Sequence, residues 1–427
     1  MRILVLGGGG REHAIVHALL KSPRNPEVLV APGNGGTASV ANNVPGLDIE
    51  NARAVADFAA ENNVDLVVIG PEGPLVAGVA DALHPRGIKV FGPSGLAARL
   101  EGSKSFAKGV MRRSGIPTGE SRSYTAREFG QALNALDVAT FPVVVKADGL
   151  AAGKGVTIAK DKREAEVAIR ACFDGLFGEA GETVLVEEFL EGPECSLLAF
   201  VDGETVTVMP PAQDHKRAFD GDAGPNTGGM GVYSPVPGID EETLAQMTRL
   251  LEKTVSGMHG ENLRFRGVLY GGFILTKDGP KVLEFNARFG DPETQVLLPR
   301  LQTDLVDIML AVADGRLGSH NVKWSDEAAV CVVLASGGYP GDYDKGKVIT
   351  GIADAEALPG VTVYHAGTQL REDGALVTSG GRVLGVTALA PTLAQARDRA
   401  YEAAAKIAFD GMQMRTDIAA RAIGGAK

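Results

Sequence analysis

Within the first 100 residues, four short apolar stretches each run directly into a loop rich in glycine and proline. The stretches are residues 3–6, 28–31, 66–69 and 89–91. Segments of helical character, such as residues 52–62 and 75–83, lie between them. Regular alternation of strand and helix predicts a doubly wound parallel sheet with right-handed crossovers. In such a sheet the loops that follow the strands gather at one edge and form a ligand crevice.

The first of these loops, residues 7–10, consists of four glycines but lacks the G-x-G-x-x-G spacing of a dinucleotide-binding turn. The third position of that pattern falls on Glu12 or His13. Free backbone amides bind anions, so this edge fits the phosphate of a small phosphorylated substrate better than NAD. The amides expected to hold the phosphate belong to Gly9, Gly10, Gly33, Gly36 and Thr37. The alternative, that these glycines only form tight turns, stays open.

A second glycine-rich loop, residues 149–155, lies between two predicted strands, and its glycine spacing differs from that of a Walker loop. We therefore expect a flexible flap whose backbone approaches phosphates. Lys146 on the preceding strand and Lys154 in the flap are expected to act as point charges toward those phosphates. A solvated glycine-rich hairpin is the alternative.

An acidic turn follows the next predicted strand. Backbone groups of residues 188–190 are candidates to pair with an adenine edge, and Glu194 is a candidate acceptor for ribose hydroxyls. Taken alone, the segment also fits a charged surface turn.

The stretch from Val282 to Asp291 begins as a strand, on which Glu284 and Asn286 share one face because side chains alternate. One carboxylate and one amide oxygen side by side suit Mg²⁺, which completes its coordination with water and substrate phosphates. Arg288 continues the alternation and offers a fork to a carboxylate or a phosphate. A solvated polar strand face is the alternative.

Residues 213–231 gather Asp, His, Lys, Arg, Asn and Thr in what the pattern predicts to be one long loop. Because no serine or cysteine nucleophile motif lies near His215, we interpret this histidine as a binding or orienting group. From about residue 325 short antiparallel strands and one long helix, about 393–408, follow. We predict regions 1–102, 103–325 (with a mobile lid at about 122–190) and 326–427.

The composition excludes several classes of protein. The formal net charge of −11 argues against a general binder of nucleic-acid backbones. We find no apolar run of membrane-spanning length, and residues 3–6 are too short for a signal segment. Three widely spaced cysteines without a C-x-x-C pair indicate neither zinc nor a disulfide framework, so we expect a cytoplasmic protein.

Taken in order, these motifs resemble the ATP-grasp superfamily and, more narrowly, the family of glycinamide ribonucleotide synthetases (phosphoribosylamine–glycine ligases). The resemblance rests on GGREH at 9–13, APGNGGT at 31–37, GPEGPLVAG at 70–78, LEGSK at 100–104, KADGLAAGKGV at 146–156, QDHKR at 213–217, GPNTGGMG at 224–231, EFNARFGDPE at 284–293 and YPGDY at 339–343. It covers nearly the whole chain. One departure is Gly8, where the family leads us to expect a polar residue such as asparagine.

The resemblance implies an α/β fold with an N-terminal parallel sheet, central ATP-grasp domains and a C-terminal mixed or antiparallel α+β domain. It also implies ligation of glycine to 5-phospho-β-D-ribosylamine, with ATP converted to ADP and phosphate through glycyl phosphate, in purine synthesis. The cofactors implied are ATP and Mg²⁺ or Mn²⁺. No nucleic acid or membrane is implied as a partner, and channelling to neighbouring purine-pathway enzymes stays an open alternative.

Carried over residue by residue, the resemblance implies four sets of site residues. The catalytic set is Lys146, Lys154 and Arg288. The ATP-binding set is Lys104, Lys146, Gly153, Lys154, Gly155, Glu187, Glu188, Phe189, Leu190 and Glu194. The substrate-binding set is Gly9, Gly10, Gly33, Asn34, Gly36, Thr37, Glu72, Asp214, His215, Lys216, Asn226, Thr227, Gly228, Arg288 and Asp291, and the metal-binding set is Glu284 and Asn286.

Two other functions compete with this one. The first is another ATP-grasp ligase that joins a different acid or amine. The second is a non-catalytic nucleotide sensor, which is disfavoured because the metal oxygens, the phosphate lysines and the substrate loops are all present. The sequence does not determine the oligomeric state, the number of metal ions, the kinetic order or which residue contacts which substrate.

Overall fold

The computed structural model describes residues 1–151 and 155–424. Its N-terminal region is a parallel five-stranded sheet in the order β3-β2-β1-β4-β5, which confirms the predicted doubly wound sheet. The strands are β1 (Arg2–Gly7), β2 (Glu27–Pro32), β3 (Asn42–Asn43), β4 (Leu66–Ile69) and β5 (Lys89–Phe91). The chain changes direction across the sheet between β1 and β4. The crevice of the fold therefore lies at the carboxyl ends of these two strands.

Helices cover both faces of this sheet. Those of the first 102 residues are α1 (Gly10–Leu20), α2 (Thr37–Val40), α3 (Ala52–Glu61), α4 (Glu72–Val76), α5 (Val79–Leu83) and α6 (Gly95–Gly102). Helix α7 (Lys104–Arg113) follows in the chain and packs against α6 and later elements. Strand β1 is buried on both sides, so Leu4 and Leu6 join one apolar cluster and Ile3 joins the other. The single helix predicted over residues 75–83 is two helices, because Gly78 between them has a φ of 77° and ends the first.

Two four-stranded antiparallel sheets follow. The first, in the order β6-β9-β7-β8, contains β6 (Ser121–Thr125), β7 (Val143–Ala147), β8 (Val156–Ala159) and β9 (Thr183–Glu188). The second, in the order β11-β10-β16-β17, contains β10 (Glu194–Asp202), β11 (Val206–Val208), β16 (Arg266–Thr276) and β17 (Gly279–Asn286). The helices of this part are α8 (Phe129–Leu136), α9 (Lys162–Phe173), α10 (Glu241–Gly260), α11 (Thr294–Leu297) and α12 (Leu305–Asp314).

Local sequence signals set where these helices begin. Side chains of Ser, Asp, Asn or Thr accept a hydrogen bond from a first-turn amide at several helix starts. These capping residues are Asn51, Ser94, Ser103, Asp161, Asp240, Asp304 and Thr392. Helix α12 ends at Gly315, which has a φ of 70° and forms a left-handed C-terminal cap.

The C-terminal sheet has the order β12-β15-β18-β22-β19, and β23 pairs with β18. Its strands are β12 (Gln213–Asp214), β15 (Gly231–Ser234), β18 (Ala328–Ser336), β19 (Val361–His365), β22 (Arg382–Ala390) and β23 (Met412–Gln413). Two short hairpins, β13 (Arg217–Phe219) with β14 (Ala223–Asn226) and β20 (Thr368–Leu370) with β21 (Leu376–Thr378), lie outside it. The remaining helices are α13 (Ile352–Glu356), α14 (Leu393–Ala404) and α15 (Ala420–Ile423).

The long loop predicted over residues 213–231 is therefore largely strand, which corrects that prediction. The residues after Gly229 are small or β-compatible, and β15 pairs in register with β18, about 100 residues later, from Gly231–Val332 to Ser234–Ala329. No local signal reveals such a pairing. The predicted central and C-terminal regions consequently share one sheet.

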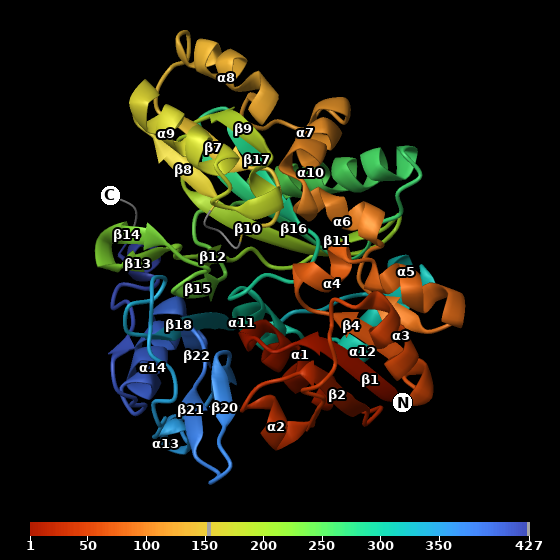
Figure 1. Ribbon diagram of the computed structural model, residues 1–427. Helices are drawn as coiled ribbons and strands as arrows, with labels where there is room; N and C mark the ends of the chain where they lie inside the picture. The colour runs from red at the N-terminus through yellow and green to blue at the C-terminus, as the bar shows by residue number, and fades with distance from the viewer. Residues whose placement is uncertain (152–154, 425–427) are drawn as a thin grey trace.

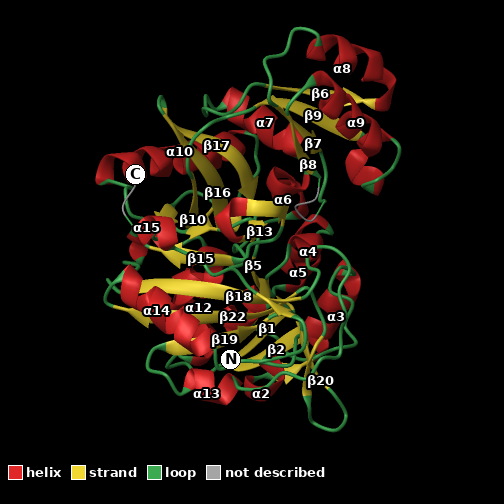
Figure 2. Ribbon diagram, turned by 90° about the vertical axis from the view of Figure 1, so that its left-hand side faces the viewer, coloured by secondary structure: helices red, strands yellow, loops and turns green. Residues whose placement is uncertain are grey.

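In Figure 1 the N-terminal and C-terminal sheets lie side by side in the lower half, and the β6–β9 sheet with α8 and α9 lies at the top. Figure 2, a view turned by 90°, shows the β10/β16/β17 sheet between these two levels. None of the helices in the described part of the chain combines the length and the apolar character needed to cross a membrane.

Candidate active site

The loops after β1 and β2 meet at the carboxyl edge of the parallel sheet, where Asn34 organises them. The side-chain oxygen of Asn34 accepts hydrogen bonds from the amides of Gly36 (2.8 Å) and Thr37 (3.0 Å). Its side-chain nitrogen donates to the carbonyls of Gly8 (3.0 Å) and His365 (2.8 Å). Two of the amides expected to hold a phosphate are thus already bonded within the chain.

Other predicted amides at this edge are also occupied. The amide of Gly9 donates to the carboxylate of Glu12 (2.7 Å), and that of Gly33 donates to the carbonyl of Gly7 (3.3 Å). A Cβ on Gly36 would lie 2.4 Å from His365 Cγ, and one on Gly10 would lie 2.6 Å from Gln295 Nε2. These glycines therefore allow close packing between segments.

A cavity of about 360 Å³ lies beside these loops. Gly8, Gly33 and Asn34 line one side of it, and Thr368, Ser379 and Gly380 from the C-terminal region line the other. Among the described residues, the amides of Gly8 and Gly380 have no hydrogen-bond acceptor. The volume is at the small end of the range for ligand pockets, and free amides with hydroxyls suit a sugar phosphate.

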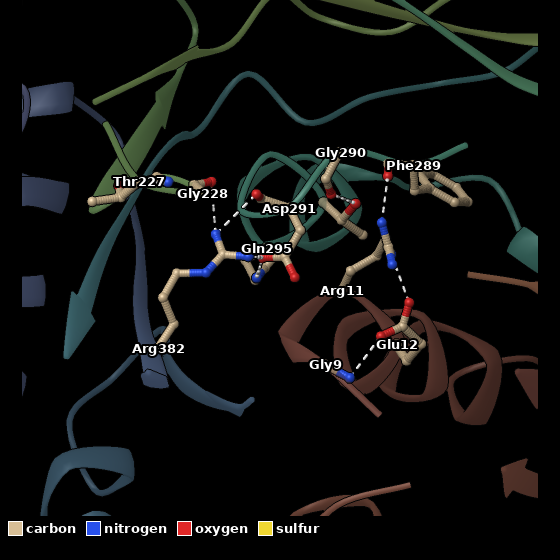
Figure 3. A network of polar contacts seen from close by, with 12 residues as sticks. Gly9, Arg11, Glu12, Thr227, Gly228, Phe289, Gly290, Asp291, Gln295 and Arg382 are labelled. Atoms are coloured by element: carbon tan, nitrogen blue, oxygen red, sulfur yellow. Dashed lines mark hydrogen bonds and ion pairs between the residues drawn. The ribbon is translucent and has the colours of Figure 1, made fainter. Parts of the chain in front are cut away.

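Arg382, at the start of β22, crosses from the C-terminal sheet to the turn that follows β17 (Figure 3). It donates to the carbonyls of Gly228 (2.8 Å) and Asp291 (2.9 Å), and its Nη2 lies 3.3 Å from the Asp291 carboxylate. Gln295 donates to the same carboxylate oxygen (2.8 Å). Arg382 and Asp291 both line the cavity.

A second arginine holds the same turn from the N-terminal side, as Figure 3 also shows. Arg11 on α1 donates to the carbonyl of Phe289 (3.2 Å) and forms an ion pair with Glu12 (2.6 Å). The turn over residues 289–291 is therefore fixed by arginines from two regions far apart in sequence.

Arg288 binds two carboxylates of the chain itself. Its Nε lies 3.1 Å from Glu72, and its Nη2 lies 2.8 Å from Glu101. Burial raises the pKa of Glu72, but Arg288 and Arg11 outweigh burial and hold it below its usual value. For Glu101 burial prevails over Arg288, and the pKa is raised. The fork predicted for a substrate anion is thus occupied by Glu72 and Glu101.

The phosphate-side lysines form a buried cluster between α7, β7 and β9. Lys146 lies 2.7 Å from one carboxylate oxygen of Glu187, and Lys108 lies 2.6 Å from the other. All three are less than 9% exposed. Burial lowers the pKa of Lys108 even though Glu187 opposes the shift. Glu187, a predicted ATP-binding residue, is placed here as the counter-ion of two lysines.

Lys104 is the first residue of α7, where Ser103 caps the helix. Its ammonium donates to the carbonyls of Ala147 (2.8 Å) and Gly149 (3.0 Å), at the end of β7. Asp148 fixes this junction by accepting from the amide of Ser105 (2.6 Å). Lys104 and Lys146 therefore lie at the same end of β7.

Glu284 and Asn286 lie two residues apart on β17, so their side chains share a face. A bulge at Leu283 breaks the alternation just before them, and Glu284 pairs with Gly272, which leaves room above the strand. Burial raises the pKa of Glu284, but Lys216, Lys146 and Lys104 outweigh burial and keep the pKa below its usual value. Glu284 is thus an ionised carboxylate facing three lysines.

The donor set fits a hard cation only in part. Glu284 and Asn286 supply two oxygens of the kind that Mg²⁺ prefers. In residues 1–151 and 155–424 no group of three or more His, Cys, Asp or Glu side chains is arranged to hold a metal by itself. The remaining ligands would have to come from water and phosphates, as is usual for Mg²⁺ bound with a nucleotide.

The predicted binding residues of 213–228 begin on β12, at the edge of the C-terminal sheet, and continue through the β13–β14 hairpin. Lys216 forms an ion pair with Glu194 (2.8 Å), a predicted ribose-binding residue. Burial lowers the pKa of Lys216, but the carboxylates of Asp214 and Glu194 raise it well above its usual value. Thr227 donates from both its amide (2.7 Å) and its hydroxyl (2.9 Å) to the carbonyl of Lys216. The loop is thereby closed on itself with Asp214 and Lys216 close together.

Other predicted residues have simpler surroundings. The amide of His215 donates to the carbonyl of Gly231 (2.9 Å), and burial lowers the pKa of its imidazole to about 4. Asn226 pairs with Arg217 in the β13–β14 hairpin. Glu188 ends β9 and is exposed, Phe189 is half-buried and Leu190 is buried after it. Gly155 accepts a hydrogen bond from the amide of Ala147 (2.8 Å), whereas Gly153 and Lys154 lie outside the described residues.

Several polar residues at these sites were missed at the sequence level. They are Lys108 and Arg382, and a buried hydrogen-bonded group of Ser196, Tyr270 and Glu293 with distances of 2.7–3.1 Å. Glu293 lies within the EFNARFGDPE motif, which was a usable signal. Arg382 has no motif around it, and only its partners reveal it.

Models of the phosphoribosylglycinamide synthetase family match three successive parts of the chain. The N domain model matches residues 1–101, the ATP-grasp (A) domain model matches residues 102–294, and the C domain model matches residues 329–421. A phosphoribosylamine–glycine ligase of Rhodopirellula baltica is 50% identical over 428 residues, which cover 99% of this chain and 98% of that protein.

A trifunctional purine biosynthetic protein adenosine-3 of Gallus gallus is 52% identical over 429 residues. These residues cover 99% of this chain and 42% of that protein, so the chain spans less than half of this relative. The crystal structure of a phosphoribosylamine–glycine ligase from Thermotoga maritima has a TM-score of 0.85 and 36% identity, covering 98% of this chain and 100% of that chain.

The sheet order, the converging lysines of β7 and α7, and the Glu284–Asn286 strand define an enzyme of the ATP-grasp class, which uses ATP. Since family models match most of its length, the chain belongs to the phosphoribosylglycinamide synthetase family, a family of ligases in purine biosynthesis.

Proposed function

We propose that the chain joins glycine to 5-phospho-β-D-ribosylamine and converts ATP to ADP and phosphate, with glycyl phosphate as the intermediate. The single observation that carries the proposal is the course of residues 284–291. This one segment begins at the ionised Glu284 among the lysines and ends at Asp291 in the cavity. These eight residues join a nucleotide site to a sugar-phosphate cavity. Such an arrangement suits a reaction in which an acyl phosphate is made at the nucleotide site and consumed at the cavity.

On the nucleotide side, Lys104 and Lys146 would neutralise the phosphates that the glycine carboxylate must approach, because both reactants are anionic. Lys154 and Gly153 of the flap are assigned to the same task from the sequence. The backbone of residues 188–190 is assigned to adenine and Glu194 to ribose. The ion pair of Glu194 with Lys216 would then have to rearrange when ribose binds.

Glu284 and Asn286 are proposed to hold Mg²⁺ or Mn²⁺ together with the phosphates of ATP. When bound, the ion supplies Lewis-acid stabilisation of the charge on the transferred phosphoryl group. The lowered pKa of Glu284 supports this assignment, because an ionised carboxylate is the form that binds a cation.

Glycine is a zwitterion, so its site needs a cation and an anion close together. Lys216, kept protonated by Asp214 and Glu194, supplies the cation. Asp214, whose pKa burial raises to about 7 although Lys216 opposes the shift, supplies the anion when it is deprotonated. His215, Asn226, Thr227 and Gly228 are assigned to the same loop of the site. Phosphoribosylamine is assigned to the cavity, with its phosphate toward Ser379 and the free amides of Gly8 and Gly380.

The experiment is an assay of ADP release with the purified chain. We expect ADP only when ATP, glycine and phosphoribosylamine are all present, and formation of glycinamide ribonucleotide in equal amount. ADP release with another acid or amine in place of either substrate would identify a different ATP-grasp ligase. ATP binding without any release of ADP would identify a nucleotide sensor.

The trifunctional relative indicates that this kind of chain can be fused to further purine biosynthetic activities. We propose that the separate chain hands its product to such enzymes by proximity. A dilution of labelled product by added unlabelled glycinamide ribonucleotide would test this, since direct transfer resists dilution.

A further inference from the structure

Formation of the amide needs a group that accepts a proton. The attacking nitrogen enters as a neutral amine and becomes positively charged as its bond to the acyl carbon forms. Unless that nitrogen loses a proton, the intermediate returns to reactants. A base should therefore lie in the cavity where the amine of the substrate is held.

Asp291 is suited to this task by its position. Among the described residues that line the cavity, it is the one carboxylate, and Arg382, a permanent cation, cannot accept a proton. Asp291 is also the cavity residue that follows most closely on the Glu284 strand in sequence. Because the acyl phosphate is made on that side, the amine should face Asp291, and the phosphate should face Ser379 and Gly380.

The carboxylate of Asp291 is held by one oxygen and leaves the other available. Its Oδ1 accepts from Gln295 Nε2 (2.8 Å) and lies 3.3 Å from Arg382 Nη2. Its Oδ2 has no partner in the described part of the chain and faces Gly9, where a Cβ would lie 3.4 Å away. The side chain is 16% exposed and lines the cavity, and Figure 3 shows it between Arg382 and Gln295.

The charges around Asp291 keep its carboxylate in the form that accepts a proton. Burial raises the pKa of Asp291, but Arg382, Arg11 and Gln295 outweigh burial and hold the pKa below its usual value. A weakly basic carboxylate is sufficient, because the ammonium becomes far more acidic once the nitrogen is bonded to the acyl carbon. Asp214, the acid proposed for the glycine site, lines a different cavity with His215 and Arg415.

Resting on the proposed function, we propose that Asp291 is the general base of amide formation. Its Oδ2 removes a proton from the amine of phosphoribosylamine as the nitrogen attacks glycyl phosphate. The new C–N bond forms, one N–H bond breaks, and the C–O bond to the phosphoryl group breaks. Inorganic phosphate leaves with the electron pair of that C–O bond. The proton on Asp291 then passes to solvent.

The test compares Asp291→Asn with Asp373→Asn, a matched change at an exposed aspartate of the β20–β21 hairpin. With ATP, glycine and phosphoribosylamine, Asp291→Asn should lower kcat by about 10²-fold or more and leave the KM for the amine close to normal. Asp373→Asn should match the unchanged enzyme. A near-normal kcat for Asp291→Asn would overturn the proposal.

Two further readouts separate a base from a structural residue. With hydroxylamine replacing phosphoribosylamine, and ribose 5-phosphate filling the cavity, Asp291→Asn should still make glycyl hydroxamate. Added formate should restore part of the turnover of Asp291→Ala, because it supplies a carboxylate where the side chain was. Loss of hydroxamate in parallel with product, or no rescue by formate, would overturn the proposal. If the unchanged enzyme does not use phosphoribosylamine, the proposed function fails instead.

Discussion

Two regions of the molecule are proposed to meet phosphate, and they are built in opposite ways. Around β7, the buried side chains of Lys108 and Lys146 share one carboxylate, Glu187. Around the cavity, backbone amides and hydroxyls predominate, and the Arg382–Asp291 pair balances its own charge. The difference matches the ligands: a reacting triphosphate needs positive charge, whereas a bystander phosphate needs only hydrogen bonds and shape.

Substitutions should act differently in the two regions. In the lysine cluster, removing one charge leaves another charge buried without a partner, so folding and function change together. At the cavity, removing Arg382 or Asp291 also leaves one charge without its partner, but these side chains are 20% and 16% exposed and so are less completely desolvated. Effects on folding should therefore be larger around β7 than around the cavity.

The largest effect is expected from Glu187→Gln. Lys108 and Lys146, which are less than 9% exposed, would lose their counter-ion. Breaking a buried ion pair in this way costs about 3–5 kcal/mol. Urea denaturation should show this loss of unfolding free energy. Glu188→Gln, the same change on the exposed neighbour, should stay within about 0.5 kcal/mol. Equal effects at the two positions would contradict the contrast.

Glu284→Gln should act on catalysis rather than on folding. It keeps the volume of the side chain but removes the negative charge proposed to face the metal. A loss of about 3–4 kcal/mol in the transition state corresponds to a kcat about 10²–10³-fold lower. ATP affinity should change less, and raised Mg²⁺ should restore part of the turnover. Near-normal turnover of the folded variant at low Mg²⁺ would show that β17 has only a solvated polar face.

The junction between the N-terminal and C-terminal regions should weaken in acid. The amide of His365 donates to Nδ1 of the buried His13 (2.8 Å), and burial lowers the pKa of His365 from 6.5 to about 4. The unfolded chain thus binds a proton more readily, so this stability is present above pH 6.5 and is lost as the pH falls toward 4. The shift corresponds to about 3 kcal/mol.

Unfolding free energies of the unchanged chain and of His365→Gln, measured from neutral pH down to about pH 4, would check this. The variant should lose less stability across that window, because the residue that titrates is gone. Identical pH dependence of the two proteins would contradict the assignment.

The smallest effect is expected from Arg382→Lys at the cavity. Lysine keeps the charge but cannot hold the carbonyls of Gly228 and Asp291 and the Asp291 carboxylate at once. We expect the KM for phosphoribosylamine to rise by an amount worth about 1–3 kcal/mol, while the KM for ATP changes little. Arg371→Lys, on an exposed hairpin of the same region, is the control. A change in the KM for ATP larger than that for phosphoribosylamine would contradict the distinction between the two regions.

The sequence was sufficient for the elements that local patterns encode. The strands before each glycine-rich loop of the N-terminal region follow from local pattern and turn signals, and these were confirmed. Glu284 and Asn286 share a face because two residues on one strand must do so. The binding roles that the motifs suggest for Lys104 and Lys146 stay predictions.

Only the tertiary structure determines which partners the charged groups have. Arg288 looked free to bind a substrate anion, but Glu72 and Glu101, more than 180 positions earlier, form ion pairs with it. Arg382 carried no local signal, and its contacts lie 91 and 154 positions away. The pairing of strand β15 with β18 likewise depends on the tertiary structure. A side chain's local sequence fixes its direction on an element, whereas its charge is satisfied by whatever the packing of distant elements brings within about 3 Å.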